Sequence, residues 1–157
     1  CRTIDPQAAI ARVLFEQNRP GEAYDLMRPS LDALRRCPSM PVELVRTLNI
    51  LASVELERND PDAAEPRVTE ALKLTRMGNP DANYMYGWTR LNHARLKRAR
   101  GDLAGAESLL ADLYEPMAAT PNMIPEFLAE IAREVVRIQR ITGQGNNADL
   151  WRRRAGE

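Results

Sequence analysis

The sequence predicts an all-α fold, a solenoid of about four antiparallel helix pairs closed by a short C-terminal capping helix. Three observations lead to this fold class. A turn motif recurs every 41 or 42 residues, small and apolar residues recur in register with it, and no segment has the pattern of a strand. The composition agrees, because 44 % of the residues are apolar but only 5 % are aromatic, which suits helices closing on Ala, Leu and Val.

The recurring turn is clearest at residues 100–107. There Gly101 can adopt the left-handed conformation that ends a helix, and the Asp102 carboxylate can cap the helix that follows. Each copy of the turn has an alanine anchor, preceded five residues earlier by Asn or Gly, the residue types that enter the left-handed region most readily. The anchors are Ala23, Ala64, Ala106 and Ala148, and the turn residues are Asn18, Asn59, Gly101 and Gly143.

The register extends upstream of each anchor. Twelve residues before it stands a small or slim residue, as needed where two helices approach closely. The residues at this position are Ala11, Ala52, Ala94 and Val136. Thirteen residues before the anchors lie Ile10, Leu51, His93 and Val135, and ten residues before them lie Val13, Val54, Leu96 and Ile138. The predicted repeats cover about residues 5–38, 41–78, 81–119 and 125–156 of a single domain, residues 1–157.

Proline, aspartate and glycine set the expected helix boundaries. Asp5 and Asp81 are predicted caps, Pro29 should bend or split the second helix, and another helix should stop at Pro116 or just beyond it. Trp151 lies in a basic terminal helix and is expected to cover the end of the stack. The predicted helices run over about residues 5–17, 21–36, 42–58, 60–76, 81–100, 103–114, 126–141 and 146–155.

Residues 48–52, 59–66 and 71–72 resemble a tetratricopeptide repeat, and residues 100–110 are similar to its turn and second helix. The similarity is greatest to the 42-residue variety found in kinesin light chains and many bacterial proteins. It implies a right-handed α-solenoid. The large aromatic residue usual nine positions before the anchor is replaced here, by Leu14, Glu55, Lys97 and Gln139. Residues 143–155 also resemble the tails of bacterial serine/threonine kinases that carry such repeats.

The resemblance further implies that the first helix of each pair lines a concave surface, through positions 18, 15, 11 and 8 residues before the anchor. Seven of these sixteen residues are Arg and two are acidic. Guanidinium groups bind carboxylates in a bidentate way, and Trp88 and Leu91 offer an apolar contact beside them. We therefore expect a groove for an acidic or C-terminal peptide. The predicted binding residues are Arg12, Arg46, Asn49, Trp88, Leu91, Arg95, Arg98, Arg133, Arg137 and Arg140.

An alternative interpretation is that this arginine-rich face is only solvated. Glu130, Arg133, Glu134 and Arg137 have i,i+3 and i,i+4 spacing, at which surface ion pairs contribute only about 0.2–0.5 kcal/mol each. Both interpretations stay open at this point.

Several classes of function find no support in the sequence. Lys+Arg and Asp+Glu are 22 each, so net charge predicts neither a nucleic-acid nor a membrane partner. No apolar run suits a membrane span, and no secretory signal is recognisable, so we expect a cytoplasmic protein. Because the chain opens on Cys1 rather than Met, we also expect it to be part of a longer protein.

Catalytic chemistry is equally absent from the pattern. His93 takes a register position filled elsewhere by apolar residues, so we interpret it as a packing residue. Cys1 and Cys37 are too few for a disulfide framework or a zinc site, and no phosphate loop or kinase motif is present. We predict no cofactor, no metal and no enzymatic activity for this segment.

Three functional hypotheses remain. The first is a non-catalytic scaffold or regulatory module that binds a protein or peptide partner. The second is the regulatory or substrate-recruiting segment of a bacterial signalling enzyme such as a serine/threonine kinase. The third is a structural repeat domain that associates into homodimers through its exposed ends.

Overall fold

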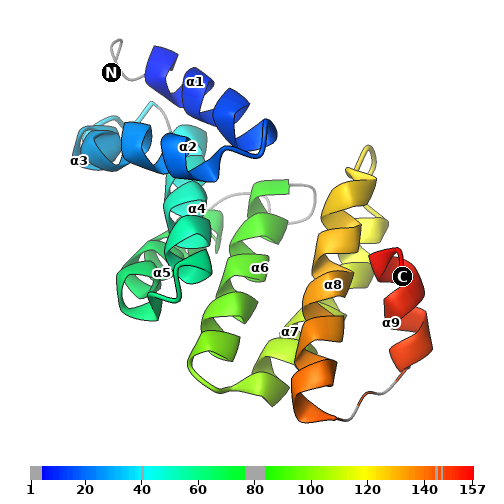
Figure 1. Cartoon of the computed structure of the whole chain (residues 1–157). Coiled ribbons are helices and arrows are strands. Elements are labelled where there is room, and N and C mark those ends of the chain that lie inside the picture. The colour runs from blue at the N-terminus through cyan, green and yellow to red at the C-terminus, as the bar shows by residue number, and fades with distance from the viewer. Residues whose placement is uncertain (1–4, 40, 77–83, 144, 146) are drawn as a thin grey trace. The chain divides into compact units, whose positions relative to one another are not determined.

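The computed structural model describes residues 5–39, 41–76, 84–143, 145 and 147–157, and in these residues every regular element is a helix. The chain divides into two compact units, Cys1–Gly78 and Asn79–Glu157. Each unit is built of helix pairs, as the sequence predicts (Figure 1). The single-domain organisation stays a prediction.

The first unit contains two helix pairs. Its elements are α1 (Asp5–Glu16), α2 (Pro20–Met27), the 3-10 turn η1 (Arg28–Ser30), α3 (Leu31–Arg35), α4 (Pro41–Glu57) and α5 (Pro61–Arg76). Pro29 lies in η1 and splits the second helix as expected, since it lacks the N–H that a continuous α-helix needs there. The helices α1 and α2 pack together, α2 and α3 pack on α4, and α4 packs on α5.

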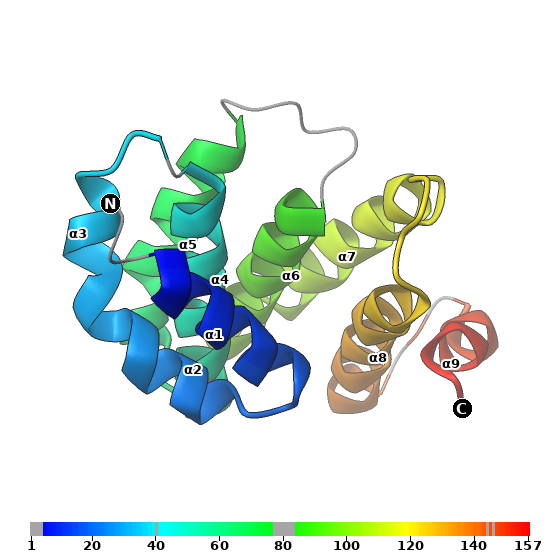
Figure 2. The same cartoon turned by 90° about the horizontal axis from the view of Figure 1, so that it is seen from above.

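The second unit repeats this arrangement. It consists of α6 (Tyr84–Ala99), α7 (Leu103–Ala118), α8 (Pro125–Thr142) and α9 (Ala148–Ala155). Successive helices pack on one another, and Figures 1 and 2 show α9 beside α8. Trp151 of α9 is buried and meets Tyr114 of α7 edge to face, with 5.3 Å between ring centroids. The terminal helix therefore packs on α8 and reaches α7, and it closes this end of the stack as predicted.

The backbone confirms the predicted turns at all four positions. Asn18, Asn59, Gly101 and Gly143 have φ values of 58°, 57°, 87° and 67°, in the left-handed region. After each of the first three, the next backbone N–H donates to a carbonyl five residues back at 2.9 Å, the bond that closes a helix end. Asp102 caps α7 by accepting from the Gly105 N–H at 2.9 Å, whereas the predicted cap Asp81 lies outside the described residues.

Small residues allow the close helix contacts. Ala11, Ala52 and Ala94, at the position twelve residues before the anchors, are fully buried, as are the anchors Ala23, Ala64 and Ala106 (the two sets are the helix-crossing points of each pair). Gly87 plays a similar part in the second unit. A Cβ added there would lie 2.7 Å from the Met117 sulfur and 2.9 Å from the Phe127 ring, so a larger residue at this position would require these side chains to move.

Candidate functional site

Three of the five arginines predicted in the second unit lie around one carboxylate, that of Glu134 in α8. Arg98 Nε lies 2.5 Å from Glu134 Oε1, and Arg95 Nε lies 3.5 Å from Oε2. Arg137 Nη1 is 3.9 Å from Oε2, beyond hydrogen-bond distance. The Glu134 side chain is only 2 % exposed, so its charge requires these partners. The cluster of Arg95, Arg98 and Glu134 joins α6 to α8.

A second carboxylate completes the contact between these two helices. Arg95 Nη2 donates to Glu130 Oε1 at 2.6 Å, so that Arg95 bridges two glutamates one turn apart on α8. The side chains of Arg95 and Arg98 are largely buried by this arrangement. Two of the predicted ligand-binding arginines thus have a structural role in holding α6 and α8 together.

The remaining arginines form an exposed row along α8. Arg133, Arg137 and Arg140 follow one another at i, i+4 and i+7, and we call them the α8 arginine row. Arg133 pairs with Glu126 at 2.5 Å and Arg140 pairs with Glu157 at 2.6 Å. The Arg137 side chain is 61 % exposed and, among the described residues, has only its long contact with Glu134. Arg137 is therefore the member of the row least constrained by an internal partner.

Acidic residues offset much of the predicted positive charge. Among the described residues of this face, the arginines at 95, 98, 133, 137 and 140 are paired with the glutamates at 126, 130, 134 and 157. The excess is one positive charge. The face is thus intermediate between the two interpretations of the sequence, because its buried part is an ion-pair network and its outer part still presents guanidinium groups.

The two apolar residues predicted for the groove lie in the core. Leu91 is 0 % exposed, and Trp88 is buried with its ring 5.8 Å from that of Tyr84. Tyr84 in turn meets Phe127 of α8 at 4.9 Å. These side chains pack within the described structure and do not present the exposed apolar contact that the sequence led us to expect. The spacing before the anchor predicts which side of the helix these residues occupy. It does not predict whether a neighbouring helix covers them.

The predicted residues of the first unit also differ in accessibility. Arg12 is exposed, with Glu16 at 3.9 Å. Arg46 is mostly buried and donates to both carboxylate oxygens of Glu43, at 2.7 and 2.9 Å. Asn49 is buried. Of the two arginines, only Arg12 exposes its guanidinium group to solvent.

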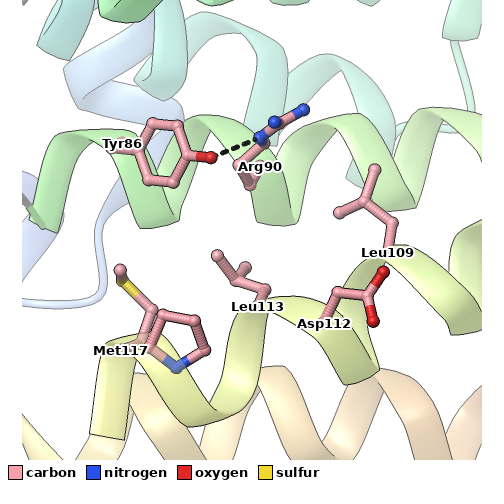
Figure 3. Close-up of a pocket in the computed structure, with 7 residues that line it drawn as sticks. Tyr86, Arg90, Leu109, Asp112, Leu113 and Met117 are labelled. Atoms are coloured by element: carbon pink, nitrogen blue, oxygen red, sulfur yellow. Dashed lines mark hydrogen bonds between the residues drawn. The ribbon is translucent and has the colours of Figure 1, made fainter. Parts of the chain in front are cut away.

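A pocket of about 360 Å³ lies between α6 and α7, on a surface that the sequence did not single out (Figure 3). Leu109, Leu113 and Met117 contribute its apolar lining. On its α6 side Arg90 Nε donates to the Tyr86 hydroxyl at 3.1 Å, and Asp112 supplies a carboxylate from α7. The pocket combines an apolar lining with one cationic and one anionic group, and carries no set of groups suited to acid–base or nucleophilic chemistry.

A buried polar pair recurs between successive helix pairs. Tyr24 of α2 donates its hydroxyl to Glu55 of α4 at 3.3 Å, and Gln139 of α8 donates to Glu107 of α7 at 2.8 Å. Tyr24 and Glu107 directly follow their anchors, and Glu55 and Gln139 both stand nine residues before theirs. In repeats 2 and 4 the position that lacks the usual aromatic residue therefore forms a polar contact. Burial raises the pKa of Glu55, and nearby Arg67 opposes that increase.

Sequence reasoning missed the pairing of Arg95 and Arg98 with glutamates of α8, although the register contained a signal for Glu134. Fourteen residues before the anchor, repeats 2 and 3 have Ile50 and Asn92, and both are buried. Glu134 occupies the same position in repeat 4, so its burial follows from the repeat. A charge at a core position requires a cationic partner, which points to the arginines of the preceding first helix.

The described residues contain no group of three or more His, Cys, Asp and Glu side chains that could hold a metal ion, and no helix among them has the length and apolar composition of a membrane span. His93 is half-buried on α6. Cys37 is buried and disulfide-bonded.

Comparison with known proteins gives one match. Residues 87–112, which cover most of α6 and the first part of α7, match the family model described as tetratricopeptide repeat. The match includes the turn at Gly101 and Asp102, and it supports a tetratricopeptide-repeat family. No curated protein and no solved structure matches the chain.

Proposed function

We propose that the chain is a non-catalytic protein-interaction module, a scaffold or regulatory segment that binds a peptide of a partner protein. The observation that carries this proposal is the tetratricopeptide match over α6 and α7, because repeats of this kind are generally interaction modules. The all-helical pairs and the recurring left-handed turns agree with it. The 42-residue variety, the bacterial origin and the cytoplasmic location belong to the same proposal.

The binding surface in this proposal is the α8 arginine row. Its guanidinium groups stand on one side of a single helix, so they suit a partner segment with several carboxylates. Arg137 offers the first contact because it has no close internal partner. Arg95 and Arg98 support the surface by holding α6 against α8, and the excess of positive charge, although small, favours an acidic peptide over a basic one.

The test is charge reversal at the outer arginines, Arg137→Glu with Arg140→Glu. Short peptides rich in Asp and Glu are selected for binding to the unaltered chain, and their affinity for both proteins is measured by titration calorimetry. We expect a loss of about tenfold or more, since reversal replaces attraction with repulsion at two exposed positions.

Arg19→Glu is the matched control, because Arg19 is an exposed arginine of the first unit, outside the row, and also has an i,i+3 acidic neighbour, Glu22. It should leave affinity unchanged. Equal affinities for all three proteins, with circular dichroism showing full helicity, would exclude the α8 arginine row as the binding surface.

The kinase-linked hypothesis concerns the protein that contains this segment. A regulatory or recruiting segment of a signalling enzyme would bind its target in the same way, so the two hypotheses share the module and differ in what the polypeptide contains beyond residues 1–157. The coding sequence that surrounds the segment separates them.

A further inference from the structure

The first helix of the chain carries an exposed apolar stripe. Pro6, Ile10 and Val13 of α1 lie at i, i+4 and i+7, which places them on one face of the helix. Ile10 is 53 % exposed and Val13 is 43 % exposed, so both lie on the side of α1 that does not pack on α2 and α4. We call these three residues the α1 stripe.

The same register positions are buried in other repeats. In α4 they hold Thr47, Leu51 and Val54, and in α8 they hold Ile131, Val135 and Ile138, all of them buried. The α1 stripe is thus apolar and exposed at a place where two equivalent helices of this chain are covered.

The covering element in both cases is the second helix of the preceding pair. The Tyr24–Glu55 hydrogen bond puts α2 against the face of α4 that carries Leu51, one turn from Glu55. The Gln139–Glu107 hydrogen bond likewise puts α7 against the face of α8 that carries Val135. In each case the covering helix directly precedes the covered one in the polypeptide.

The last helix, α9, has a charged residue at a position where the second helices of the other pairs have an apolar one. Four residues after the anchor, the second helices of the first three pairs have Met27, Val68 and Leu110, which are buried. At this position α9 has Arg152, whose side chain is 51 % exposed. The exposed residues of α9, Asp149, Arg152 and Arg153, are all charged, as a terminal cap requires, so this helix does not complement the apolar α1 stripe of a second copy.

We propose that the α1 stripe is the docking face for the second helix of a further helix pair, contributed by the polypeptide that directly precedes α1. That helix takes the place on α1 that α2 has on α4. It has an apolar face that buries Ile10 and Val13, and the position of Leu14, equivalent to Glu55 and Gln139, predicts an apolar rather than a polar neighbour on it.

The experiment compares two proteins. One is residues 1–157, and the other also includes the natural sequence encoded directly upstream, over the length of one repeat. Ile10→Gln with Val13→Gln is introduced into both, because glutamine keeps helix propensity and removes the apolar surface. Val42→Gln is the control, since Val42 is an exposed apolar residue outside the stripe. Thermal unfolding is followed by circular dichroism, and hydrogen exchange of the α1 amides is measured in the unaltered proteins.

We expect the double substitution to lower the unfolding midpoint of the extended polypeptide by about 5 °C or more and that of residues 1–157 by less than about 2 °C. The control should act equally in both, and α1 should exchange more slowly in the extended protein. Equal effects of the double substitution, or equal exchange, would overturn the proposal. So would a dimer of residues 1–157 in sedimentation velocity that the double substitution dissociates, because a second copy would then cover the stripe.

Discussion

Glu55 shows how one residue of the repeat departs from an apolar core. Its carboxylate is 3 % exposed, accepts a hydrogen bond from Tyr24 at 3.3 Å and has Arg67 Nε at 3.7 Å. Its Oε2 atom has no hydrogen-bond partner among the described residues, and neither has Arg67 Nε. Burial therefore outweighs the attraction of Arg67, and the pKa of Glu55 is raised.

The first prediction at this scale concerns Glu55→Gln. A raised pKa means that the folded state favours the protonated form, so the stabilising contribution is complete below the ordinary Glu pKa of about 4.3 and is lost as pH rises through the raised value. Gln139 is the uncharged equivalent in the same register position, where it forms its own hydrogen bond. At pH 7.5 the variant should be more stable than the unaltered protein, because it removes the cost of burying a charged carboxylate.

Urea unfolding at pH 7.5 and at pH 5 measures this effect. The advantage of the variant should shrink as the pH falls, because protonation of the native carboxyl removes the buried charge. Glu57→Gln, at an exposed position of the same helix, should change stability little at either pH. A Glu55→Gln protein that is clearly less stable at pH 7.5 would show that the ion pair with Arg67 outweighs burial.

At the scale of the elements, Glu134 is the contact that joins α6 to α8. Removing a buried charge from its partners costs about 3 kcal/mol or more, whereas an exposed ion pair contributes about 1 kcal/mol or less. Glu134→Gln should therefore lower the free energy of unfolding by about 3 kcal/mol, since Arg95 and Arg98 lose the carboxylate that they share.

Glu126→Gln is the matched comparison, because Glu126 also pairs with an arginine of the same face but is 75 % exposed. It should cost less than about 1 kcal/mol in the same urea experiment. Similar losses for the two variants would mean that burial does not distinguish these ion pairs.

The turn between α6 and α7 gives a second prediction for the elements. Gly101 has φ +87°, a conformation that costs an L-residue with a side chain about 1–2 kcal/mol. Gly101→Ala should destabilise the protein by about that amount, although open space surrounds the added methyl group. Gly21→Ala, in α2, lacks this backbone strain and also has open space around it, so thermal unfolding should show no loss and even a small gain.

Three prolines affect their helices in different ways, and the local sequence predicts these effects only in part. Pro29 divides one helix into α2, η1 and α3, as expected. Pro66 lies inside α5, near its start, where the hydrogen bond that it cannot form falls in the first turns. Pro116 lies inside α7, which continues to Ala118, so this proline ends its helix only after a further two residues. Burial of Met117 next to it supplies packing that keeps this last turn helical.

At the scale of the whole molecule, the repeat explains why the fold class and the helix boundaries can be predicted from the sequence. The left-handed turns, the small residues at helix crossings and the apolar periodicity are local features, and each repeats four times. A local feature that recurs in register constrains helix boundaries and pairing together, so the fold class and nearly every helix boundary follow from it. The capping role of Trp151 follows as well, because a repeat array needs a terminal element that covers its last apolar face.

The sequence by itself thus determined the helices, their turns and the face on which the arginines stand. Only the tertiary structure decided how those arginines are used. Arg95 and Glu130 are 35 residues apart, as are Arg35 and Glu70, and such partners meet only after helices of different pairs have packed. The physical reason is that charge pairing and burial depend on the helix opposite, so Glu134 draws Arg95 and Arg98 into the core contact while Arg137 stays at the surface.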